Sequence, residues 1–206
     1  MDEKRMIGDY TVLNTMYVGH KEIAICENPK AESNERYLCC YVENVAIFER
    51  YTEGVASDDF AEIAKVFGER IISAADEIMK ETEKAEKLIG ENTEIMTDEC
   101  NAISYMDSIE NKVVVIKGNI LRPEFRHASH QLMLCTGGFG SQPNARGRTC
   151  YCISLYDGKK TSYYRSDILG TMDKEMLPEW AKDKLEKAKE IHEAEKKPPK
   201  ERGEAR

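Results

Sequence analysis

The sequence predicts an α+β protein, with an antiparallel β meander and a long helix first, then a small β-rich unit and a C-terminal helix. Three observations support this class. Short alternating apolar runs fill the first 48 residues, one apolar stripe at helical spacing begins near residue 60, and a second series of β-type runs follows residue 111. The expected divisions are a meander plus helix at 1–90, a linker or boundary at 91–110, a basic β-rich module at 111–172, a helix at 173–196 and a disordered tail at 197–206.

The N-terminal segment has the pattern of a half-buried antiparallel meander. Residues 10–18 and 22–26 alternate between apolar and polar types on either side of Gly19, and residues 36–42 form a third run. Alternation is expected because successive strand side chains point to opposite faces. Residues 28–34, which include Pro29, are expected to form a loop.

A long helix is expected to begin after residues 57–59. Asp59 can cap the free amides of the first turn, and Glu62 stands at the spacing of a capping box. The apolar residues that follow recur on one helical face, and Gly90 marks the stop. This stripe, expected to pack on the preceding strands, consists of Phe60, Ile63, Ala64, Phe67, Ile71, Ala74, Ala75 and Ile78.

The second half is expected to form a β-rich unit closed by a helix. Residues 112–117 give the clearest strand, with further strands at 132–136, 149–156 and 161–165. The pair Asp157-Gly158 indicates a hairpin turn. The last helix is expected to start near Leu177, with Trp180 and Leu185 on its inner face.

Charge is distributed unevenly along the chain. Residues 111–170 contain nine Lys and Arg against three acids, a net of +6, whereas the whole chain carries −8. A basic module within an acidic protein points to a phosphate-bearing or acidic partner. The absence of a long apolar run argues against a membrane span, so a cytoplasmic protein without membrane contact is expected.

Two constellations in the basic module could carry function. The first is the glycine-containing loop 137–148, where flexible backbone and the guanidinium groups of Arg146 and Arg148 could meet phosphate. The loop matches neither a nucleotide-triphosphate loop nor a dinucleotide fingerprint. The alternative is a long hairpin connection whose glycines serve turn geometry and whose arginines are solvated.

The second constellation combines basic and aromatic groups, as RNA and single-stranded nucleic acid require. It contains Arg122, Arg126, His127 and His130, with Tyr163, Tyr164 and Arg165 if their strands are neighbours. The two histidines could also act as acid and base in RNA cleavage, because imidazole titrates near neutral pH. The alternative is that they are ordinary surface or packing residues.

The seven cysteines lack the spacing of a disulfide framework or of a zinc knuckle. Cys150 and Cys152 read instead as alternate positions on one face of a strand. No cofactor and no metal are therefore expected.

Several motifs together resemble accessory proteins of conjugative transposons and plasmids of Gram-positive bacteria. They are 11–22 with the Gly19 turn, 57–59, 121–126, 137–140, 145–148, 165–170 and 177–181. Some similar mobile-element proteins belong to the anti-CRISPR group, which disables type II RNA-guided nucleases, in certain cases by interfering with or trimming the guide RNA. The resemblance implies a counter-defence setting and supplies no catalytic motif that can be carried over.

The leading hypothesis is a counter-defence protein that contacts the guide RNA, or the protein–RNA assembly, of a host nuclease. The expected nucleic-acid-binding residues are Arg122, Arg126, Arg146, Arg148, Lys159, Lys160, Tyr163, Tyr164 and Arg165. One alternative is a ribonuclease that trims guide RNA, with His127 and His130 as its catalytic residues. Another is a non-enzymatic adaptor of the conjugation machinery.

Overall fold

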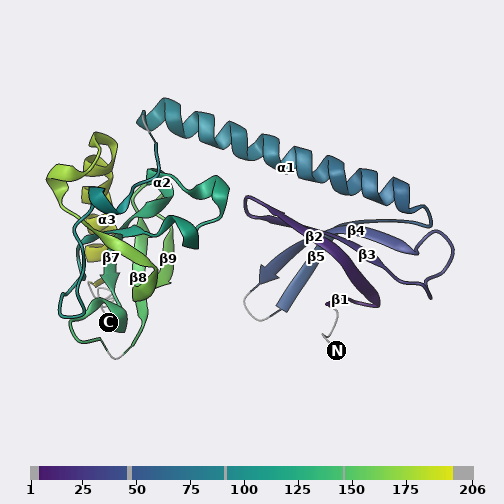
Figure 1. Ribbon diagram of the computed structural model, residues 1–206, viewed down its shortest axis with the longest axis horizontal. Helices are drawn as coiled ribbons and strands as arrows, with labels where there is room; N and C mark the ends of the chain where they lie inside the picture. Colours follow the sequence, from purple (N-terminus) through teal and green to yellow (C-terminus); the bar gives the residue numbers. More distant parts are fainter. Residues whose placement is uncertain (1–4, 46–47, 91, 146, 197–206) are drawn as a thin grey trace, which may run out of the picture. The chain divides into compact units, whose positions relative to one another are not determined.

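The chain forms two compact units, Met1–Lys84 and Ala85–Arg206. The computed structural model describes residues 5–45, 48–90, 92–145 and 147–196. Each unit contains one five-stranded antiparallel sheet, drawn in Figure 1. The α+β class expected from the sequence is confirmed, and the expected disordered tail at 197–206 lies outside the described residues.

The first sheet is a meander in which every strand pairs with the next along the chain. Gly8 and Gly19 take positive φ angles of 56° and 58° in its first two turns, a conformation that favours glycine. The strands are β1 (Met6–Ile7), β2 (Tyr10–Val18), β3 (Lys21–Glu27), β4 (Tyr37–Val45) and β5 (Phe48–Ser57).

Helix α1 (Phe60–Ile89) covers one face of this sheet (Figure 1). The Asp59 cap is confirmed, because its carboxylate accepts a hydrogen bond from the amide of Ala61 at 2.8 Å. In place of the expected capping box, Glu62 accepts from the Ser57 hydroxyl at 2.7 Å, and the Asp59 amide donates to that hydroxyl at 3.1 Å. Its end is also as expected, with Gly90 at φ 74°. The apolar stripe, including Ile63 and Phe67, packs against buried strand residues Ile23, Ile25 and Cys39.

The opposite face of the first sheet holds a smaller core and one buried carboxylate. Ala24, Cys26, Cys40 and Val42 pack there beneath Ile7 of β1. Beside them lies Glu22, which is only 1% exposed. A buried charge must be paired to be tolerated, and the pairing comes from the N-terminal segment.

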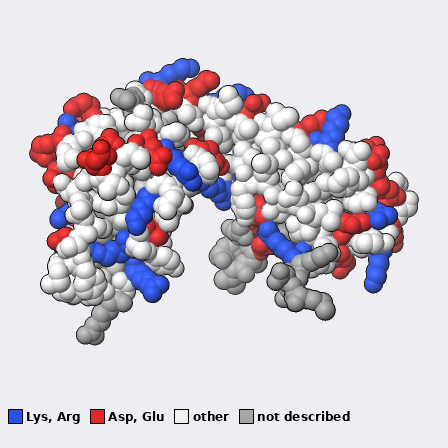
Figure 2. All heavy atoms as spheres, in the orientation of Figure 1, with Lys and Arg blue, Asp and Glu red and all other residues white. Residues whose placement is uncertain are grey.

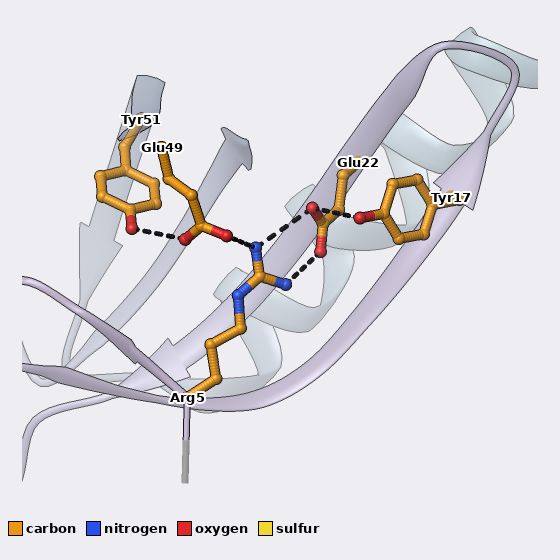
Figure 3. A network of polar contacts seen from close by, with 5 residues as sticks. All are labelled: Arg5, Tyr17, Glu22, Glu49 and Tyr51. Atoms are coloured by element: carbon orange, nitrogen blue, oxygen red, sulfur yellow. Dashed lines mark hydrogen bonds and ion pairs between the residues drawn. The ribbon is translucent and has the colours of Figure 1, made fainter. Parts of the chain in front are cut away.

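Figure 3 shows this pairing. The guanidinium of Arg5 donates to both carboxylate oxygens of Glu22, and the Tyr17 hydroxyl donates to Glu22 Oε2 at 2.7 Å. Arg5 also pairs with Glu49 at 2.7 Å, and the Tyr51 hydroxyl donates to Glu49 at 2.8 Å. The hydrogen bond to Glu22 raises the pKa of Arg5 further above its ordinary value. The network therefore ties the segment before β1 to β2, β3 and β5.

The second sheet has the strand order β10-β6-β7-β8-β9, so the last two strands form its two edges. Tyr164 ends β9 and Ile168 begins β10, and four residues span at most about 14 Å. The edges of a flat five-stranded sheet would lie about 19 Å apart. The sheet must therefore curl. The strands are β6 (Val113–Ile116), β7 (Leu132–Gly137), β8 (Thr149–Ser154), β9 (Lys160–Tyr164) and β10 (Ile168–Met172).

Short helical turns fill most of the connections in this unit. Turn η5, between β9 and β10, is bonded to two other parts of the sheet: the Arg165 amide donates to the Arg148 carbonyl at 2.8 Å, and the Lys117 amide to the Asp167 carbonyl at 2.9 Å. The turns are η1 (Thr97–Glu99), η2 (Gly118–Ile120), η3 (Pro123–Phe125), η4 (Phe139–Ser141), η5 (Arg165–Asp167) and η6 (Lys174–Met176), together with the four-residue helix α2 (Ala128–Gln131).

Both faces of the second sheet are packed. Leu134 of β7 and Ile153 of β8 point into a core with Ala181 and Leu185 of helix α3 (Glu179–Lys196). The opposite, inner core contains Val114, Ile116, Met133, Cys135, Cys150, Cys152 and Ile168. The alternation expected of Cys150 and Cys152 is confirmed, and both thiols are buried.

Residues 91–110 were expected to be a linker or boundary, and the structure corrects this for the described part of the segment. Ile95 belongs to the core beneath α3, and Ile109 belongs to the inner core. Asn101 forms a β-bridge with Thr171 of β10. The apolar residues of this segment that reach the core are isolated and irregularly spaced. They therefore give neither a helical nor a strand periodicity, and the sequence pattern resembles that of a polar linker.

Candidate nucleic-acid interface

The glycine loop between β7 and β8 is shaped by its contact with β8. A Cβ atom on Gly140 would lie 2.3 Å from the carbonyl oxygen of Arg148, and one on Gly138 would lie 2.4 Å from that of Thr149. Glycine is needed at both positions because the loop backbone packs directly against the backbone of residues 148–149. The turn-geometry alternative therefore accounts for Gly138 and Gly140, and phosphate binding by the loop stays a prediction. Arg146 lies outside the described residues.

Arg165 also has a structural role that its sequence did not reveal. Its guanidinium donates to the carbonyl of Gly140 at 2.7 Å and to those of Ser104 and Asp107, both at 2.8 Å. Three acceptors hold one planar donor group, so the side chain clamps the glycine loop to the segment before β6. Its capacity to bind a phosphate is correspondingly reduced.

The histidine cluster lies around α2 and is tightly packed. The ring of His130 stacks on Phe125, with 4.8 Å between centroids, and its Nδ1 lies 3.0 Å from the Ser129 hydroxyl. His127 is half-buried at the start of α2, where its carbonyl oxygen accepts amide hydrogen bonds from His130 and Gln131. These contacts are those of packing residues, and the catalytic role of the two histidines stays a prediction.

The other expected residues are dispersed. Arg122 is half-buried at the start of η3, and Arg126 donates from Nε to the Leu121 carbonyl at 3.3 Å. Lys159 forms an ion pair with Asp157 at 3.0 Å. Tyr163 turns inward and packs against the inner core.

The expected residues therefore do not converge into one cluster. The α2 end of β8, where Tyr156 lies near His130, also carries Lys159 and Lys160. Arg148 and Tyr164 lie at the other end, since Thr149 pairs with Tyr164. A six-residue strand spans about 17 Å, which separates the two ends. The outer face of β8 and β9 extends between these two ends.

We call this surface the β8–β9 face and define it by register. Tyr151 pairs with Ser162, and Tyr164 pairs with Thr149, so these side chains share one face with Lys160. Tyr151 is 58% exposed and Tyr164 is 56% exposed. The same side of β8 continues at Ile153 into the core beneath α3. The β8–β9 face is thus the uncovered part of a face that α3 otherwise covers.

One cation, Lys160, lies on this face, and a second, Arg148, is next to it in the chain at the start of β8. Arg148, directly before β8, is exposed, and Lys160 is exposed at the start of β9. Figure 2 shows several Lys and Arg side chains gathered over the part of the second unit where Figure 1 places β8 and β9. Binding of single-stranded nucleic acid requires cations close to flat, exposed aromatic rings.

Two aromatic residues of this region did not enter the sequence-based site. Tyr151 stands between Cys150 and Cys152, and since both cysteines face inward, alternation alone places Tyr151 outward. That signal was present in the sequence. Phe139 is 82% exposed on η4, and nothing in the glycine loop distinguishes it as a surface residue.

Comparisons with known proteins do not supply an identity. No family model matches the chain, and neither a curated protein nor a solved structure matches it. Within the ranges that the structure describes, no helix is both long and apolar enough to cross a membrane. Among the same residues, no group of three His, Cys, Asp or Glu side chains is placed to hold a metal ion.

Proposed function

We propose that this chain is a counter-defence protein that inhibits a host RNA-guided DNA nuclease by contacting RNA through the β8–β9 face. One observation carries the RNA contact: Tyr151 and Tyr164 are exposed diagonal neighbours on a strand face that also carries Lys160, and the exposed Arg148 directly precedes β8. The setting rests on the resemblance of its motifs to mobile-element accessory proteins.

In the proposed contact, the tyrosine rings stack on bases and the cations neutralise the phosphate backbone. Every base has a π-face, so exposed tyrosines bind RNA with little sequence preference. Cations neutralise the backbone and release counterions, which makes the affinity depend on salt. A protein with net charge −8 needs such a local surface, because its overall field repels a polyanion.

Salt dependence tests the contribution of the cations. The variant Arg148→Ala/Lys160→Ala is expected to reduce the slope of log Kobs against log salt for single-stranded RNA by about 1.4, since each phosphate contact on a single strand contributes about 0.7. Fluorescence anisotropy of a labelled guide RNA across a salt series measures it. The control Arg50→Ala/Lys65→Ala removes the same charges from exposed positions of the first unit and should leave the slope unchanged.

Inhibition is tested separately with purified RNA-guided nuclease and a target DNA. The proposal predicts less cleavage with the wild-type protein, recovery of cleavage with Arg148→Ala/Lys160→Ala, and intact guide RNA throughout. Full cleavage with the wild-type protein, together with stable capture of a conjugation protein, would instead support the adaptor alternative.

A further inference from the structure

We infer that the β8–β9 face takes two consecutive unpaired nucleotides, with one base stacked on Tyr151 and the next on Tyr164. This inference rests on the proposed function and specifies the form of nucleic acid that the face accepts. The observations that carry it are the register of the two strands and the exposure of the two rings.

The register fixes how far apart the rings stand. Tyr151 lies opposite Ser162 and Tyr164 lies opposite Thr149, so the tyrosines are diagonal neighbours on one face. Diagonal neighbours in an antiparallel pair are about 7–8 Å apart. The residues directly opposite them are small, so neither ring is covered by its cross-strand partner.

That spacing selects against a duplex. Successive bases in a duplex are stacked about 3.4 Å apart, roughly half the separation of the tyrosines. Both rings can be covered together only if the two bases are unstacked and spread apart, which requires an unpaired strand. Lys160 is on the same face, two positions beyond Ser162, where it can contact the backbone of the spread strand.

The neighbouring tyrosine provides a matched control. Tyr163 precedes Tyr164 in the chain but packs into the inner core, so it cannot contact a base stacked on the outer face. The variant Tyr163→Phe removes the hydroxyl and keeps the partly buried ring. Tyr163→Phe should therefore bind as the wild type does, and it controls for the loss of a tyrosine hydroxyl in β9 away from the β8–β9 face.

The test uses the full chain and a short oligouridine with two adjacent 2-aminopurines, free or annealed to its complement. We expect quenching of 2-aminopurine by stacking, and binding to the single strand at least about tenfold tighter than to the duplex. Tyr151→Ala and Tyr164→Ala should each weaken single-strand binding by about tenfold or more. Tyr151→Phe, Tyr164→Phe and Tyr163→Phe should bind as the wild type does, because each keeps its aromatic ring.

The outcomes separate the two claims. Equal binding to duplex and single strand, or alanine variants that bind as tightly as wild type, overturns the two-nucleotide inference while an RNA contact remains. Absence of binding to either form overturns both claims. Tyr164→Leu, which keeps apolar bulk without a flat ring, guards against loss of folding: if it binds as well as Tyr164→Phe, stacking is not the interaction. The fluorescence of Trp180, the single tryptophan, checks that the second unit is folded.

Discussion

Replacing Arg5 by Met is expected to destabilise the first unit by about 3 kcal/mol, the lower end of the cost of breaking a buried ion pair. The loss arises because Glu22, only 1% exposed, keeps its charge without the guanidinium that neutralises it. The Tyr17 hydroxyl still donates to Glu22, but it is neutral and does not compensate the charge. The lower end applies because the Arg5 side chain is 35% exposed, so water can partly replace it.

Urea unfolding followed by far-UV circular dichroism measures this effect. The matched control is Arg36→Met, which breaks an exposed pair with Glu27 and should cost less than about 1 kcal/mol. Trp180 fluorescence reports on the second unit and should be unchanged. A double-mutant cycle with Glu22→Gln should show strong coupling. If the effects of Arg5→Met and Glu22→Gln simply add, the network is not a unit.

Replacing Gly140 by Ala is expected to destabilise the second unit by about 3 kcal/mol, a large value for overpacking. The added Cβ would lie 2.3 Å from the carbonyl oxygen of Arg148 and 2.6 Å from its carbonyl carbon. Both atoms belong to the backbone, so no side-chain rotation relieves the clash. The glycine loop must move away from β8, which also disturbs the contact of Arg165 with the Gly140 carbonyl.

Here Trp180 fluorescence during urea unfolding is the direct readout. Gly68→Ala gives a control of opposite sign, because a Cβ at this helical position would meet nothing within 4 Å. It should stabilise α1 by roughly 0.5–1 kcal/mol through better helix propensity. A Gly140→Ala protein whose second unit unfolds at the wild-type urea concentration would show that the close approach of loop and strand is not required.

The sequence was sufficient for features that depend on local pattern. The stripe from Ile63 onward, the Asp59 cap and the Gly90 stop defined α1, because periodicity and capping act within a few residues. The strands around Cys150 and Cys152 were also found from local composition. The placement of Tyr151 could have been derived from the same alternation.

Features that depend on distant pairing could not be derived this way. In the sequence, Glu22 is indistinguishable from an exposed polar residue of a strand. Its burial depends on an ion pair with Arg5, which lies 17 residues earlier in the chain. Arg165 contributes a positive charge to the sequence count, but its guanidinium is held by three backbone carbonyls. The net charge of a segment does not show where each side chain points. The net charge of residues 111–170 therefore exceeds the number of cations that are available to bind a ligand.

The most direct test of the RNA contact is photo-crosslinking of wild-type protein to single-stranded RNA containing 5-iodouridine, followed by mass spectrometric mapping of the attached peptide. Exposed rings stacked on bases should be the main sites of attachment, so we expect crosslinks at Tyr151 and Tyr164. Crosslinks confined to the first unit, or a pattern unchanged in Tyr151→Ala/Tyr164→Ala, would contradict the assignment of RNA binding to the β8–β9 face.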